Sequence, residues 1–265
     1  HHFYRNDDPW PKLLLHDVLK RHGYGTAIIS SQNEAWGGMD KFLETSQLDL
    51  FYHPERSDVP TVVAERDPGF WREHLAGTLV AGKFPDGHTT DVALQWIRDQ
   101  VAAKKPYCLS MNYQSSHFPY LIPDDVPRPF QPSDLADEIK FSSYPIERTA
   151  NVRNAYYNGI HECDRQIGRV IAELKRLGQL ENTIVVVTGE NGEAFHEAGC
   201  VGHAGLPVEP VVRVAAVMYG PGTIKPSRED YPFEHVDLAP TLLGILGLPS
   251  HPNFQGRNIL ATDRP

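Results

Sequence analysis

The chain has 265 residues, 40% of them hydrophobic, which is enough to bury a sizeable core in one large domain or two small ones. Its formal net charge is -9, from 34 acidic and 25 basic residues. No cluster of lysines and arginines is present to neutralise a phosphate backbone, so we expect no nucleic-acid partner. Thirteen histidines supply candidate metal ligands and acid–base groups.

Cysteine spacing and hydropathy exclude further classes of protein. Cys108, Cys163 and Cys200 show no C-x-x-C spacing, which excludes a disulfide framework and a cysteine-type zinc site. No apolar stretch reaches the roughly 18 residues of a membrane span, and the first residues show no signal-peptide pattern. We therefore expect a globular protein with no membrane span in this chain.

Helices and buried strands alternate in the first half of the sequence. Apolar residues at helical spacing predict a short amphipathic helix over residues 11–22, and residues 25–30 follow as a buried strand. Helical spacing returns over residues 89–103, before a second buried strand over residues 107–112. The hydrophobic residues in 42–87 show no clear period, and we assign this segment no chemical role.

The second half contains the strand around which the chain is organised. A long helical pattern over residues 147–177 leads directly into residues 183–188, whose β-branched run predicts a strand buried on both faces. A further strand is expected over residues 213–219 and a helix over residues 236–247. This alternation predicts an α/β fold, a layered and mostly parallel sheet with helices on both faces.

Polar oxygen ligands follow the central strand. In open parallel sheets, ligands bind beyond the carboxyl ends of the strands, and here Glu190, Asn191 and Glu193 occupy that position. Carboxylate and carboxamide oxygens suit a divalent cation. The plain alternative is an acidic turn that only solvates the strand end.

Other strand ends carry histidine and aromatic residues. His117 follows the strand at 107–112, and the glycine-rich loop over residues 195–205 brings His203 where backbone and imidazole can approach an anion. Gln32 and Trp36 follow the strand at 25–30 and suit a pocket wall. A structural histidine and a plain loop are the alternatives, and the shared position at strand ends favours a common site.

Several segments, in order, resemble the sulfatases of the alkaline phosphatase-like superfamily: NTIVVVTGENGEAFHEAG, GHAG, RVAAVMYGPG, HVDLAPTLLGILGLP and QGRNIL. Upstream, LLLHDVLKRHGYGTAIIS resembles the family's segment before its substrate-binding loop, and YNGIHECDRQIGRVIAELKRLGQLENT resembles the helix before its metal strand. The resemblance covers most of the chain. It implies a single sulfatase-like α/β domain over residues 1–265, partial at its N-terminus.

The resemblance implies metal-dependent hydrolysis of a sulfate ester through a covalent intermediate on a Ser, Thr or Cys-derived nucleophile. By position, Glu190 and Asn191 correspond to the family's metal pair, with calcium as the expected ion and zinc or manganese as alternatives. His203 corresponds to the Lys or His that contacts the substrate anion or leaving group, and His117 to the His of the H-x-P motif. Both histidines are therefore our catalytic candidates. The substrate-binding candidates are Gln32, Trp36, His117 and His203.

The sequence also departs from the family pattern. Glu190 stands where an Asp is usual, and a longer ligand changes the metal geometry. The family's sulfate-binding Lys and His near residues 31–38 are replaced by Gln32, Asn33 and Trp36. In the family, the nucleophile lies on a strand and helix upstream of the segment that begins here at Leu13. Residues 1–12 contain nothing that corresponds to it. We therefore expect two open strand edges and an inactive chain, unless an N-terminal segment or a second chain completes it.

Alternatives of other kinds stay open. The chemistry could be that of a phosphoester or phosphonate hydrolase, or of a phospho-group transferase of the same superfamily. A non-catalytic module that binds an anion is a third reading. The expected partner is a small-molecule or glycan sulfate or phosphate ester. The family's habit implies a periplasmic or extracellular location, although no targeting segment is seen.

Overall fold

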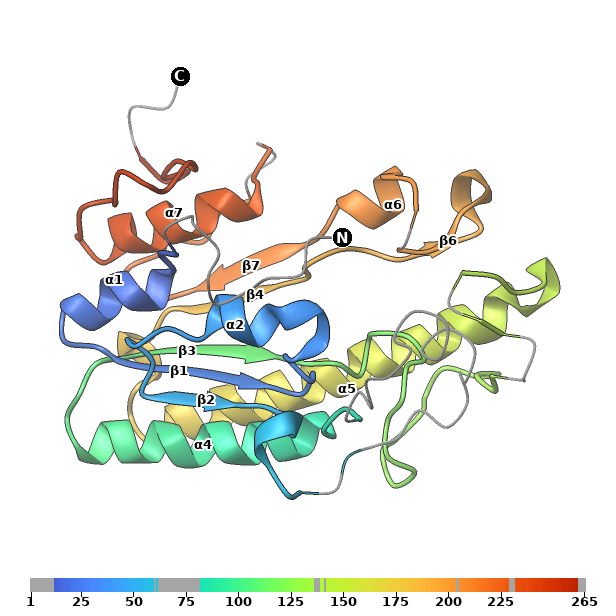
Figure 1. The fold of residues 1–265 in the computed structure, drawn as a ribbon, viewed down its shortest axis with the longest axis horizontal. Helices are drawn as coiled ribbons and strands as arrows, with labels where there is room; N and C mark the ends of the chain where they lie inside the picture. Colours follow the sequence, from blue (N-terminus) through green and yellow to red (C-terminus); the bar gives the residue numbers. More distant parts are fainter. Residues whose placement is uncertain are drawn as a thin grey trace.

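The computed structural model describes residues 12–59, 61, 82–135, 139–140, 142–203, 205–228 and 232–261. Its central feature is a parallel sheet in the strand order β2–β1–β3 (Figure 1). The strands are β1 (Gly25–Ser30), β2 (Leu50–Tyr52) and β3 (Tyr107–Asn112). Because the three strands are parallel, their carboxyl ends meet at one edge of the sheet.

Strand β1 is the most deeply buried part of this sheet. All six of its residues are buried, since it has a neighbouring strand on each side. Ala27 and Ile29 pack against Trp96 and Ile97 of helix α4 (Asp86–Ala102) and Leu174 of helix α5 (Thr149–Arg176). The two helices contact each other and run alongside the strands (Figure 1). This apolar layer holds the strands in place and so positions their carboxyl ends, where the polar residues lie.

A separate antiparallel pair joins β4 (Val185–Thr188) to β7 (Ala216–Tyr219). The prediction that the central strand is buried on both faces is wrong: Val187 is 37% exposed, and Thr188 is also exposed. The reason lies in the pairing. Within the described residues β4 pairs only with β7 and β3 only with β1, so each strand has one open edge.

Short elements complete the described part of the chain. Residues 42–87 contain β2, which the sequence did not reveal because three residues are too few to show a period. None of the described helices is long and apolar enough to cross a membrane. The remaining helices and strands are α1 (Leu15–Arg21), α2 (Met39–Leu43), β5 (Ala194–Phe195), β6 (Val201–Gly202), α6 (Glu209–Val212) and α7 (Leu238–Ile245).

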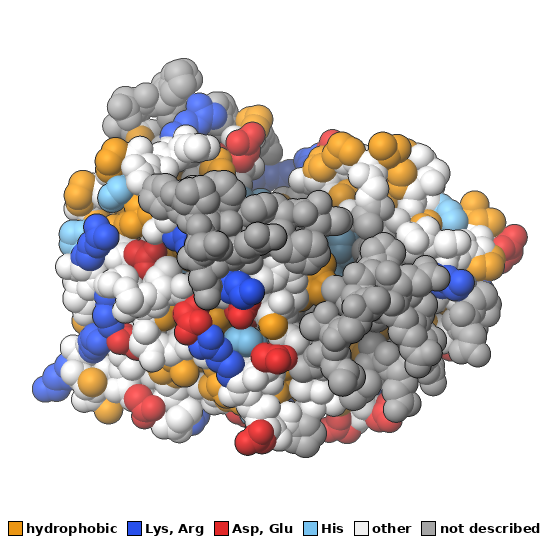
Figure 2. Space-filling view, viewed as in Figure 1, with side chains coloured by type: hydrophobic (Ala, Val, Ile, Leu, Met, Phe, Trp, Pro, Cys, Tyr) orange, Lys and Arg blue, Asp and Glu red, His pale blue; other side chains and the backbone are white. Residues whose placement is uncertain are grey.

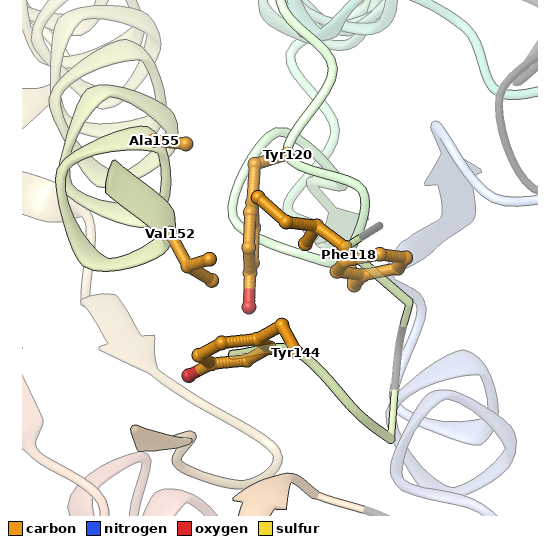
Figure 3. Packing of buried hydrophobic residues seen from close by; sticks show 6 residues of the cluster. Phe118, Tyr120, Tyr144, Val152 and Ala155 are labelled. Carbon is orange, nitrogen blue, oxygen red and sulfur yellow. The ribbon is translucent and has the colours of Figure 1, made fainter. Parts of the chain in front are cut away.

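An aromatic cluster anchors the loop that follows β3. Phe118 and Tyr120 are buried with Tyr144 against Val152 and Ala155 of α5 (Figure 3). The rings of Phe118 and Tyr120 meet edge to face, with centroids 5.5 Å apart. Such packing holds the backbone that follows residue 117 in one position.

Helix α5 approaches this loop so closely that only glycine fits at position 159. A Cβ atom at Gly159 would overlap the carbonyl group of Ser115. We expect Gly159→Ala to destabilise the protein by about 2–4 kcal/mol, because neither backbone can move away without disturbing its packing. Gly168→Ala on the same helix is the control. Nothing lies within 4 Å of its added Cβ, so the change should be stabilising by up to about 1 kcal/mol. Equal effects of the two changes in urea denaturation would contradict the close contact.

Candidate active site

Two predicted catalytic residues from distant parts of the sequence lie side by side. The imidazole centroids of His117 and His203 are 5.1 Å apart, and the rings meet edge to face at 70°. His117 follows the end of β3, and His203 follows β6. Burial lowers the pKa of His117 to about 3, and the charge of Lys83 adds to this effect. His117 is therefore a neutral imidazole over the physiological range of pH.

Lys83 completes this pair and was missed by the sequence analysis. Its Nζ lies 3.0 Å from Nδ1 of His117 and 3.1 Å from the carbonyl oxygen of Phe118. Burial lowers the pKa of Lys83 to about 7, while the charges of Asp86 and Glu190 act in the opposite direction. A lysine in such surroundings switches between ammonium and amine near neutral pH.

The backbone explains how Lys83 reaches the site. The amide N–H of Phe84 donates to the carbonyl oxygen of Ser31 at 2.9 Å, so the segment before α4 runs alongside the end of β1. Lys83 thus comes to the end of β1 from a segment outside residues 31–38. Nothing in the pattern of residues 42–87 indicated this, because the contact is made only in the folded chain.

The predicted metal pair follows β4. The negative charge of Glu190 acts on both Lys83 and Glu34, which places Glu190 at the same edge of the sheet as the histidines. Asn191 donates through Nδ2 to the carbonyl oxygen of Gly192 at 2.8 Å, which leaves Oδ1 as the oxygen for a ligand. The structure brings the two imidazoles together, while the role of Glu190 and Asn191 as metal ligands stays a prediction.

A second missed residue, Glu34, lies at the carboxyl ends of β1 and β3. Its carboxylate is buried and accepts hydrogen bonds from Ser30 Oγ at 2.5 Å and from Asn112 Nδ2 at 3.3 Å. Burial raises its pKa, the two hydrogen bonds lower it, and the charges of Glu190 and Asp40 raise it further. No signal in the sequence distinguished Glu34 from an ordinary loop glutamate.

The donor set fits part of a cation site. Glu190 and Asn191 offer a carboxylate and a carboxamide, which suit a hard cation, but calcium takes 6–8 oxygen ligands. In the part of the chain that the structure describes, no group of three or more His, Cys, Asp or Glu side chains could hold a metal ion. The two residues would therefore need oxygens from water, from the substrate or from another segment.

The two remaining predicted site residues, Gln32 and Trp36, follow the end of β1. The backbone N–H of Gln32 donates to Ser30 Oγ at 3.0 Å. Trp36 begins a short 3-10 turn, Trp36–Gly38, and is 43% exposed. Across the described ranges, no hydrogen bond or ring contact is seen between either residue and His117 or His203. Their role in substrate binding stays a prediction.

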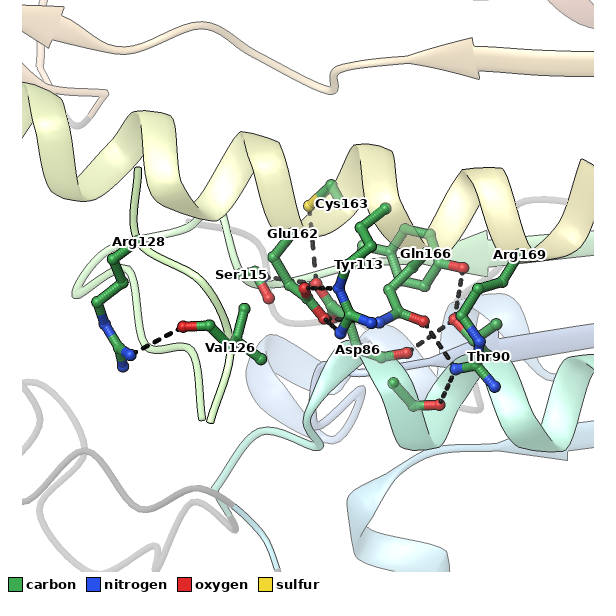
Figure 4. Close-up of polar contacts among 12 residues, drawn as sticks. Asp86, Thr90, Tyr113, Ser115, Val126, Arg128, Glu162, Cys163, Gln166 and Arg169 are labelled. Carbon is green, nitrogen blue, oxygen red and sulfur yellow. Dashed lines mark hydrogen bonds and ion pairs between the residues drawn. The ribbon is translucent and has the colours of Figure 1, made fainter. Parts of the chain in front are cut away.

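Asp86 ties the strand ends together (Figure 4). Its buried carboxylate, at the first residue of α4, accepts the backbone N–H groups of Gln114 and Ser115, both at 2.9 Å. It also accepts the hydroxyl of Ser31 at 2.6 Å. One carboxylate thus links the end of β1, the loop before His117 and the helix. This network holds the loop before His117 in a fixed position relative to β1 and α4.

Charged side chains of both signs lie on the molecular surface. Figure 2 shows acidic and basic side chains interspersed over the coloured part of one face.

Comparison with known proteins gives the family. The sulfatase family model matches residues 2–248. Arylsulfatase K of Mus musculus is 27% identical over 289 aligned positions, which cover 92% of this chain and 48% of the relative. The chain thus spans about half the length of this curated relative.

Two solved structures share the fold. The phosphonate monoester hydrolase from Silicibacter pomeroyi has a TM-score of 0.63 at 18% identity, covering 96% of this chain and 61% of that chain. The protein BT4656, in complex with its substrate D-glucosamine-2-N,6-O-disulfate, has a TM-score of 0.62 at 16% identity, covering 96% and 65%. The expected alkaline phosphatase-like α/β fold is confirmed. Because the family model extends over nearly the whole sequence, the chain belongs to the sulfatase family.

Proposed function

We propose that the protein hydrolyses a sulfate ester in a metal-dependent reaction, and that this chain supplies the part of the active site that binds the oxyanion. The meeting of Lys83, His117 and His203 carries the proposal. These three residues come from three separate segments, yet Lys83 and His203 both lie against His117. Imidazole and ammonium groups are suitable donors to the oxygens of a sulfate group.

The three side chains have different tasks in this proposal. Lys83 supplies positive charge to the sulfate oxygens while it is protonated. His117, which is neutral, donates a hydrogen bond without adding charge. His203, whose side chain is 20% exposed, protonates the leaving oxygen.

A cation held by Glu190 and Asn191 would polarise the sulfate group as a Lewis acid. Calcium is our proposal for this ion, with zinc and manganese as alternatives. The expectation that another segment or chain brings the nucleophile stays a prediction. So does the location of the protein outside the cytoplasm.

We propose a sulfated glycan or small aryl sulfate as the substrate. BT4656, which shares the fold, binds a disulfated glucosamine. A phosphonate monoester is the second candidate, because the Silicibacter pomeroyi enzyme shares the fold to the same degree. Both substrates have a tetrahedral anionic centre that could accept hydrogen bonds from Lys83, His117 and His203.

The test uses the natural protein that contains this chain. Its hydrolysis of an aryl sulfate, an aryl phosphate and a phosphonate monoester is compared before and after removal of metal by a chelator. We expect the highest kcat/KM for the sulfate, its loss on chelation and its return with calcium. Faster turnover of the phosphonate would establish the second candidate. Binding of sulfate without turnover of any ester would establish a non-catalytic module.

A further inference from the structure

We propose that Glu193 is a positioning residue that holds the imidazole of His203 with its proton on Nδ1. The inference rests on the proposed role of His203 and goes further, by assigning a task to a carboxylate that the metal pair does not use. Oε2 of Glu193 lies 3.3 Å from Nδ1 of His203. A carboxylate at this distance accepts the Nδ1 proton.

The fold places these two residues opposite each other. Strands β5 and β6 pair antiparallel, with Ala194 facing Gly202. Residues 193 and 203 are the next pair along this hairpin. The side chain of Glu193 is 4% exposed and that of His203 is 20% exposed. The carboxylate is therefore inside the protein while the imidazole reaches its surface.

The carboxylate of Glu193 is close to two buried tyrosines. Burial raises the pKa of Tyr144 to about 12, and the charge of Glu193 adds to this rise. The pKa of Tyr120 is also raised, by burial first and then by the charge of Glu193. The carboxylate thus stands among phenol groups of the aromatic cluster, where little water competes for the histidine.

This arrangement decides which ring nitrogen meets the substrate. In water a neutral imidazole prefers its proton on Nε2, but an acceptor on Nδ1 reverses that preference. Nε2 lies on the opposite side of the ring from Glu193. It is then the nitrogen that exchanges a proton with the substrate, and the carboxylate stabilises the imidazolium that forms. A ring turned over would lose this contact.

Proton-detected 15N NMR of the imidazoles in the purified chain tests the proposal without any turnover. At alkaline pH, where a free imidazole is neutral, we expect His203 to carry its proton on Nδ1. Glu193→Gln should keep this tautomer, because the amide oxygen still accepts a hydrogen bond. Glu193→Leu should return the proton to Nε2. Glu197→Gln is the control, as it changes an exposed carboxylate of the same loop.

A proton on Nε2 of His203 in the unchanged chain would overturn the proposal, and so would an unchanged tautomer in Glu193→Leu. If the leucine variant fails to fold, the tautomer of His203 in the unchanged chain and in the glutamine variant still tests the proposal. In the natural protein, Glu193→Gln should lower kcat by at least tenfold for esters with poor leaving groups, with little effect on KM or on activated aryl esters. Failure of the sulfatase proposal leaves the tautomer result intact, so the two outcomes are distinguishable.

Discussion

Replacing Lys83 by methionine is expected to abolish sulfate binding by the purified chain and, at the same time, to stabilise its fold. Lys83 places its ammonium group against His117, so its removal takes away positive charge at the proposed oxyanion site. Methionine has a similar volume and no charge to bury. We expect at least a tenfold loss of sulfate affinity below pH 7, measured by isothermal titration calorimetry.

The pH dependence gives a second measurement of the same residue. Since the pKa of Lys83 in the folded chain is about 7, sulfate affinity should fall by up to tenfold per pH unit above that value. The unfolded state keeps the ordinary lysine pKa, so it binds more protons than the folded state between pH 7 and about 10. Stability should therefore rise with pH across this window.

Lys83→Met removes this dependence and should raise the free energy of unfolding by up to about 5 kcal/mol at pH 7. Lys20→Met is the control, because Lys20 forms an exposed ion pair with Asp49. It should change stability by less than about 1 kcal/mol and leave sulfate binding intact. Full sulfate affinity in Lys83→Met would contradict a role for Lys83 in the oxyanion site.

Asp86→Ala is expected to cause the largest loss of stability, roughly 3–5 kcal/mol in urea denaturation. Its carboxylate is the acceptor for Gln114 N–H, Ser115 N–H and the Ser31 hydroxyl, all in a buried place. Without it, the two backbone N–H groups lose their acceptor and cannot reach water, whereas the Ser31 hydroxyl keeps its contact with Thr89. The loop that carries His117 should also exchange its amide hydrogens faster.

Asp91→Ala on the same helix is the matched control. Asp91 is 64% exposed and pairs with Arg169 at 2.5 Å. We expect a loss below about 1 kcal/mol, because water replaces an exposed ion pair well. The loss of stability in Asp86→Asn should lie between these two values, since its amide oxygen still accepts hydrogen bonds. A cost for Asp86→Ala as small as that of Asp91→Ala would contradict the network.

Much of the fold followed from local patterns. The strands at residues 25–30 and 107–112 have the predicted bounds because each is an apolar run flanked by a helix and a turn. Strand β2 was missed, since its three residues carry no period. Burial of the strand before Glu190 was overestimated, because β-branched composition does not report how many neighbours a strand has.

The candidate site was predicted in part. His117 and His203 were identified because each follows a strand of the predicted sheet, and the structure brings their rings together. Lys83 and Glu34 escaped because their importance comes from burial beside distant residues, not from a motif. Trp36, chosen for its position after β1, is 43% exposed, and its role in substrate binding stays a prediction.

The central claim is that one oxyanion site is formed by Lys83, His117 and His203. Sulfate titration of the purified chain, followed through the imidazole NMR signals, tests it most directly. We predict that the signals of His117 and His203 shift together along one saturation curve, that exposed His22 does not respond, and that Lys83→Met cancels both shifts. Signals of the two histidines that stay unmoved by sulfate, or that shift at unrelated concentrations, would contradict a shared site.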